Sequence, residues 1–135
     1  MAQPAETQLL DLTRQLLNSI ADQDWSAYTR LCDPSLTCFE PESRGQLVKG
    51  MDFHKFYFEL KGGRGPRNTT LVSPHARLLG PEAGVVSYVR LIQKLDANGS
   101  PVTSAVEETR IWQRIQGEWK HVHFHRSETA HAPAS

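Results

Sequence analysis

Three histidines and an arginine lie close together near the end of the chain, in the segment WKHVHFHR that covers residues 119–126. The histidines occupy every second position and are His121, His123 and His125. In a strand, successive side chains point to opposite faces, so this pattern predicts three imidazoles on one face and Val122, Phe124 and Arg126 on the other. Imidazoles bind Zn²⁺, but the outer two would lie about 13 Å apart at ~3.3 Å per residue, too far to share one ion. We therefore expect no metal site here, and a half-buried histidine surface near another subunit.

Arginines recur on the two strands predicted just before this segment. The same alternation selects Arg90 on the strand predicted over residues 84–95 and Arg110 on the strand predicted over residues 102–115. If these faces belong to one face of the sheet, the two guanidiniums meet Arg126 beneath the helices. An unpaired buried charge costs several kcal/mol, so the three arginines need anions or water.

Two interpretations of the arginines stay open. In the first, Glu108 and other acidic residues pair with them, or their charged ends reach solvent. In the second, they line a pocket for a carboxylate, a phosphate or an acidic peptide group, because the planar guanidinium matches such anions. His54 and Tyr57, on a predicted helix, and Glu108 would complete this pocket.

Enzyme chemistry is the alternative function. His54, Tyr57 and Glu108 are candidates for proton abstraction in an isomerase, dehydratase or hydrolase. Three arginines, however, favour holding an anion over a neutral substrate and a base of raised pKa. The sequence has no GxSxG motif, and the loop GGRGPR lacks the GK[ST] ending of a phosphate-binding loop. We expect no catalytic residue and no cofactor.

The bulk composition is that of one soluble domain spanning residues 1–135. Lys+Arg and Asp+Glu both total 15, so no net charge draws the chain to nucleic acid or to an anionic membrane, and self-association meets little repulsion. No signal peptide or membrane span of ~20 apolar residues is visible, which predicts a cytoplasmic protein. Cys32 and Cys38 are expected to be reduced, buried thiols.

Periodicity predicts helices first and strands afterwards. The expected helices cover residues 6–21, 25–32 and 51–61, the second capped by Asp24. The expected strands cover residues 36–39, 69–79 (interrupted at Pro74), 84–95, 102–115 and 118–126. On the third helix, we expect one apolar face made of Phe53, Phe56, Tyr57 and Leu60. This order predicts an α+β fold in which helices cover one face of a curved antiparallel sheet, with residues 1–5 and 128–135 disordered.

Six stretches resemble a known family. They are CDPSLTCFEPE (32–42), VKGMDFHKFYFE (48–59), SPH (73–75), YVRL (88–91), EETRIW (107–112) and VHFHRS (122–127). Together they resemble the association (hub) domain of calcium/calmodulin-dependent protein kinase II, from about residue 6 to residue 127.

The resemblance implies a cone-shaped fold of the nuclear transport factor 2-like superfamily, with a long N-terminal helix packed in a curved antiparallel sheet. It implies a homo-oligomer, a dodecamer or a larger double ring, that holds linked or co-assembling kinase domains, since full-length members are serine/threonine kinases. It also implies that the ligand pocket of the family falls on His54, Arg90, Arg110 and Arg126 and accepts small carboxylates such as γ-hydroxybutyrate. The hub itself is then no enzyme.

Overall fold

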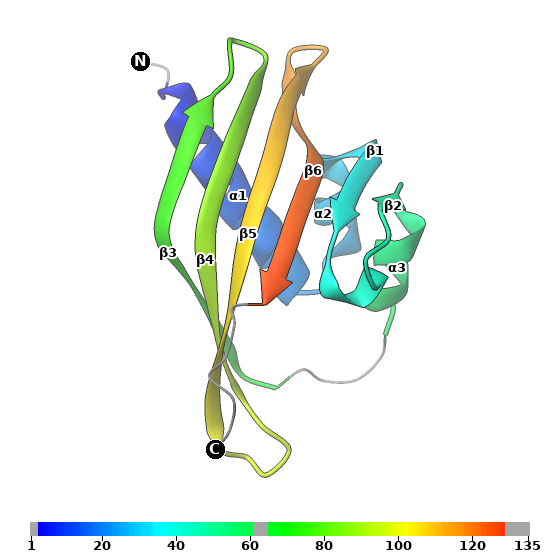
Figure 1. Cartoon of the computed structure of the whole chain (residues 1–135), viewed down its shortest axis with the longest axis vertical. Helices are drawn as coiled ribbons and strands as arrows, with labels where there is room; N and C mark the ends of the chain where they lie inside the picture. Colours follow the sequence, from blue (N-terminus) through cyan, green and yellow to red (C-terminus); the bar gives the residue numbers. More distant parts are fainter. Residues whose placement is uncertain (1–2, 61–64, 129–135) are drawn as a thin grey trace.

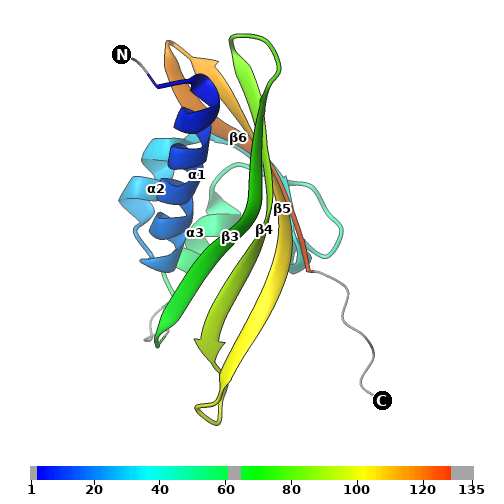
Figure 2. The same cartoon turned by 90° about the vertical axis from the view of Figure 1, so that its left-hand side faces the viewer.

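The computed structural model describes residues 3–60 and 65–128. Its centre is a six-stranded sheet with the strand order β2-β1-β6-β5-β4-β3. Figure 1 shows helix α1 running across this sheet, and Figure 2 shows that the three helices cover one face while the other face stays open. The predicted α+β fold, with a curved sheet and helices on one side, is confirmed.

Helix α1 (Ala5–Ala21) packs an apolar stripe onto the sheet. Leu9, Leu16 and Leu17 are buried at the helical spacing that the sequence shows. Thr13, on the same stripe, accepts a hydrogen bond of 3.1 Å from the indole Nε1 of Trp112 on the sheet. The helix is therefore fixed to the sheet by apolar packing and by one buried hydrogen bond.

Helix α2 (Trp25–Leu31) begins where the sequence predicts, because the Asp24 carboxylate accepts a hydrogen bond of 3.0 Å from the amide of Ala27. It ends one residue before the predicted end. Cys32 was expected in the helix, but it opens strand β1 (Cys32–Phe39). The residue before a proline disfavours helix, and here extended backbone begins one residue earlier still.

The remaining strands are β2 (Val48–Lys49), β3 (Arg67–Leu78), β4 (Ala83–Leu95), β5 (Pro101–Ile115) and β6 (Glu118–Glu128). Strands β3 to β6 form the predicted antiparallel meander, and the expected interruption at Pro74 is a register irregularity between Val72 and His75. Strand β2 was not predicted. Strand β1 pairs with β6 in parallel, so the sheet is antiparallel except at this pair.

Strand β6 carries a β-bulge that overturns one prediction. Ile111 pairs with His123 while Trp112 pairs with His121, which leaves Val122 as the extra residue. A bulge reverses the alternation of side chains beyond it. His121, expected on the outer face, is therefore fully buried in the core, whereas His125 is exposed and His123 half-buried.

Helix α3 (Asp52–Phe58) is shorter than predicted, and only part of its expected apolar face packs inward: Phe53 contacts the core. Phe56 is 62% exposed and Leu60, beyond the helix, is 50% exposed, while His54 is the buried residue. The helix is short and is held at the edge of the helical layer, so packing of His54 against Tyr28 and Phe124 decides its orientation.

At the chain ends, α1 already includes Ala5 and β6 includes Glu128, so ordered structure replaces the expected disorder at these two residues. Residues 61–64 and 129–135, which include half of the GGRGPR loop and most of the tail expected to be disordered, lie outside the described residues. Among the helices that the structure describes, none is long and apolar enough to span a bilayer.

Candidate functional site

A cavity of about 580 Å³ lies between the helices and the sheet. Helical residues such as Tyr28 and Phe58 form one side, and residues of β4, β5 and β6 form the other. Of the six residues expected to form a pocket, five line this cavity: His54, Tyr57, Arg90, Arg110 and Arg126. The three arginines thus lie on one face of the sheet. Glu108 is absent from the cavity wall, and its fully buried carboxylate pairs with Arg90 and Arg110.

Glu108 joins two of the arginines in a buried network. Its carboxylate accepts hydrogen bonds from Arg90 Nη2 (2.7 Å), Arg110 Nη2 (3.2 Å) and the Tyr88 hydroxyl (2.5 Å). Arg110 Nε also donates to the Tyr88 hydroxyl at 2.8 Å. Burial alone would raise the pKa of Glu108, but Arg110 and Arg90 outweigh it and hold the pKa below its usual value. Glu108 is therefore a structural counter-ion.

Arg90 keeps one donor unused. Its Nε is buried and, among the described residues, has no hydrogen-bond partner, while its Nη2 is bonded to Glu108. A buried donor without an acceptor costs about 1–3 kcal/mol. Because Arg90 lines the cavity, an anion inside it could supply the missing acceptor.

Arg126 is paired separately, at the other side of the cavity. Its Nη2 contacts Glu42 Oε2 and lies 3.5 Å from Glu40 Oε2. Glu42 belongs to a 3-10 turn, η1 (Pro41–Ser43), and Glu40 directly precedes it. Burial raises the pKa of Glu40, and the positive charge of Arg126 opposes this rise. The first interpretation of the arginines, pairing with acidic residues, therefore holds alongside the cavity.

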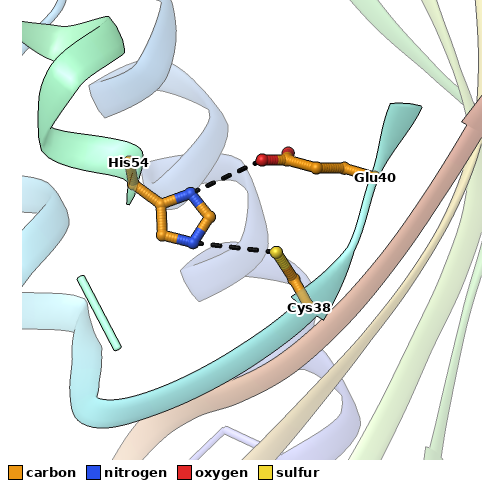
Figure 3. A group of neighbouring side chains, drawn as sticks. All are labelled: Cys38, Glu40 and His54. Atoms are coloured by element: carbon orange, nitrogen blue, oxygen red, sulfur yellow. Dashed lines mark hydrogen bonds and ion pairs between the residues drawn. The ribbon is translucent and has the colours of Figure 1, made fainter. Parts of the chain in front are cut away.

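His54 connects two residues that were not expected in the site. Figure 3 shows its ring between Glu40 and Cys38: Nδ1 lies 3.8 Å from Glu40 Oε1 and Nε2 lies 3.7 Å from Cys38 Sγ. Burial lowers the pKa of His54 to about 4, and Arg110 and Arg126 add to this effect, so the ring is neutral at pH 7. Cys38 and Glu40 stand at alternate positions of an extended segment, a spacing that could have identified them.

The trio of Cys38, Glu40 and His54 has potential ligand atoms within 4.8 Å of one another, but its geometry suits a shared metal ion poorly. The sulfur and the carboxylate contact different ring nitrogens, and an imidazole offers one ion only one of them. Burial also raises the pKa of Cys38 to about 12, so its side chain is a thiol at neutral pH.

A model of the calcium/calmodulin-dependent protein kinase II association domain matches residues 5–130. The chain belongs to this association-domain family. It is 47% identical over 128 residues to the delta subunit of calcium/calmodulin-dependent protein kinase type II from Oryctolagus cuniculus. That alignment covers 93% of this chain and 24% of the relative, so the chain spans about a quarter of the curated protein.

Solved association domains share the fold closely. The association domain of the Caenorhabditis elegans kinase is 43% identical with a TM-score of 0.84, covering 90% of this chain and 93% of that one. The hub homology domain from Chlamydomonas reinhardtii is 44% identical with a TM-score of 0.89, covering 95% and 100%. A nuclear transport factor 2-like protein from Salmonella enterica, 21% identical with a TM-score of 0.74 over 93% and 91% of the two chains, shows the shared fold alone. The predicted family is confirmed, and so is the predicted nuclear transport factor 2-like fold.

Proposed function

We propose that this association domain is a non-catalytic oligomerisation module that assembles into a ring of identical subunits, a dodecamer or larger, in the cytoplasm. Its membership of the association-domain family carries the proposal. The balanced charge supports it, because copies of the chain do not repel one another. The ring would hold kinase domains, either linked to the hub or assembled with it.

The open face of the sheet offers a surface for another copy. It has a shallow groove of about 660 Å³ whose wall includes Val89, Ile111, His123 and His125. The ring of Phe39 lies beside both histidines, with centroids 6.3 and 5.5 Å away. We assign one subunit contact to this face, in keeping with the expectation for the histidine surface.

Native mass spectrometry and light scattering test the assembly. A particle of many times 15.2 kDa is expected, and a monomer at micromolar concentration would contradict the proposal. Ile111→Glu, on the open face, should reduce the mass of the particle. Leu79→Glu is the matched control, since Leu79 is an exposed apolar residue outside this groove.

We also propose that the arginine-lined cavity binds a small carboxylate such as γ-hydroxybutyrate. The unused donor of Arg90 supports this, together with three guanidiniums on one wall. The ligand should raise the melting temperature in proportion to RT ln(1 + [L]/Kd), and the neutral amide of the same acid should not. Arg126→Gln should weaken the effect. Arg110→Ala should weaken it too, and because these variants strip a partner from buried Glu40 and buried Glu108 respectively, circular dichroism must show that each is folded.

The enzyme alternative is not favoured. A base for proton abstraction needs a pKa near the working pH, but the pKa of Glu108 is lowered and that of His54 is about 4. A putative ketosteroid isomerase from Shewanella frigidimarina shares the fold at only 16% identity, which supports no shared activity.

A further inference from the structure

The three arginines predicted for the pocket, Arg90, Arg110 and Arg126, each already hold a carboxylate of this chain, whereas Arg67, which also lines the cavity, forms no ion pair among the described residues. Arg90 and Arg110 share Glu108, and Arg126 is paired with Glu40 and Glu42. A ligand carboxylate that binds Arg126 therefore does not meet a free guanidinium. It has to take the place of one of these three internal carboxylates, or crowd against it.

Burial decides which carboxylate can leave. The side chain of Glu108 is 0% exposed and that of Glu40 is 8% exposed, so neither can leave its partner without remaining a buried, unpaired charge. The side chain of Glu42 is 35% exposed and lines the mouth of the same cavity. It can exchange its arginine for water at little cost.

We propose that Glu42 is an internal competitor that occupies the carboxylate position on Arg126 and is displaced when a ligand binds. This inference rests on the proposed binding of carboxylates in the cavity and adds how that binding is regulated. The carboxylate of Glu42 occupies the position that a ligand carboxylate would take on Arg126. The affinity of the site for the ligand therefore depends on the fraction of molecules in which Glu42 has left Arg126.

The backbone around Glu42 is held independently of its carboxylate. The amide and the hydroxyl of Ser43 both donate to the carbonyl oxygen of Glu40, at 3.0 and 2.8 Å. The amide of Arg44 donates to the carbonyl of Pro41 at 3.2 Å. None of these bonds uses the Glu42 side chain, so the side chain can move while η1 keeps its shape.

Electrostatic repulsion favours displacement of Glu42 by the ligand. A ligand carboxylate on Arg126 would be the third anionic group around one guanidinium, with Glu40 and Glu42. Like charges at such distances repel strongly away from bulk water. The repulsion is relieved if Glu42 leaves or if Glu40 takes up a proton, and these two routes differ in proton uptake.

The test compares γ-hydroxybutyrate binding to the whole oligomeric protein and to variants by isothermal titration calorimetry in buffers of different ionisation enthalpy. Glu42→Gln removes the competing charge and keeps the size of the side chain. We expect about fivefold tighter binding, as follows from losing one partly exposed ion pair, and no coupled proton uptake. Glu128→Gln is the matched control: Glu128 lines the same cavity, and in the described part of the chain it forms no ion pair with the arginines. It should change affinity less than twofold.

The outcomes separate the two proposals. If the native protein binds γ-hydroxybutyrate and Glu42→Gln binds no more tightly, or gains no more than Glu128→Gln, the competitor is ruled out while the carboxylate site stands. Uptake of one proton on binding would assign the change to Glu40 and also overturn the inference. If neither the native protein nor Glu42→Gln binds, both proposals fail. Binding by Glu42→Gln alone would support both, with the native site fully self-occupied.

Discussion

Nε2 of His121 lies 3.3 Å from Nη1 of Arg110, in the buried interior of the sheet. The other ring nitrogen, Nδ1, lies 3.5 Å from the sulfur of Cys32. The ring also stacks on Phe124, with centroids 5.6 Å apart and planes at 19°. Because a guanidinium only donates, Nε2 must accept, so His121 is neutral and its proton resides on Nδ1.

His121 should make the protein less stable in acid. Burial lowers the pKa of His121 well below 6.5, and the charge of Arg110 lowers it further. In mild acid, His121 therefore binds a proton in the unfolded chain but not in the folded protein. Stability is therefore full above pH ~6.5 and falls as the pH drops below it. In His121→Gln, urea denaturation between pH 7 and 5 should show a slope smaller by up to about 1.4 kcal/mol per pH unit. His75→Gln, at an exposed position of β3, is the control, and an equal slope in both variants would refute this role.

Loss of the Glu108 carboxylate should strongly lower the free energy of unfolding. Glu108→Gln leaves Arg90 and Arg110 without their shared counter-ion in the interior, which costs about 3–5 kcal/mol of unfolding free energy. Chemical denaturation followed by circular dichroism measures this loss. Glu118→Gln, whose side chain is 75% exposed beside Lys120, should cost less than about 0.5 kcal/mol. Equal losses would contradict the role of Glu108 as a buried counter-ion.

The hydroxyl group of Thr13 should contribute more to the stability of the protein than the shape of its side chain does. Thr13→Val keeps the volume but leaves the indole N–H of Trp112 buried without its acceptor, at a cost of about 1–3 kcal/mol. Thr13→Ser keeps the hydroxyl and should recover the hydrogen bond, though it loses a methyl group. Thermal unfolding monitored by tryptophan fluorescence compares the two. A valine variant as stable as the native protein would show that this hydrogen bond does not contribute.

Substitution of Gly84 should destabilise the protein, because the side chain of Leu9 on helix α1 lies against it. A Cβ at this position would stand 2.3 Å from Cδ1 of Leu9, which is fully buried. Gly84→Ala should therefore cost about 1–3 kcal/mol through overpacking. In a double-mutant cycle with Leu9→Ala, the cost of Gly84→Ala should largely vanish, since the clashing atoms are gone. Additive losses would show that the contact with Leu9 is not the cause.

The sequence by itself determined the local elements and the face that carries the arginines. Helix α1, the cap at Asp24 and the meander from β3 to β6 follow from periodicity and turn residues, which act between near neighbours in the chain. Alternation along β4, β5 and the end of β6 likewise places Arg90, Arg110 and Arg126 on one face.

Only the tertiary structure decided the rest, because it depends on partners that are distant in sequence. The bulge at Val122, which turns His121 inward, arises from pairing between β5 and β6 and leaves no signal in a single strand. The parallel pairing of β1 with β6 brings residues more than 80 positions apart together. The pairing of β1 with β2, just before α3, holds Cys38 and Glu40 near His54. Which carboxylate neutralises which arginine is likewise a matter of three-dimensional distance and burial, and these set the chemistry of the cavity.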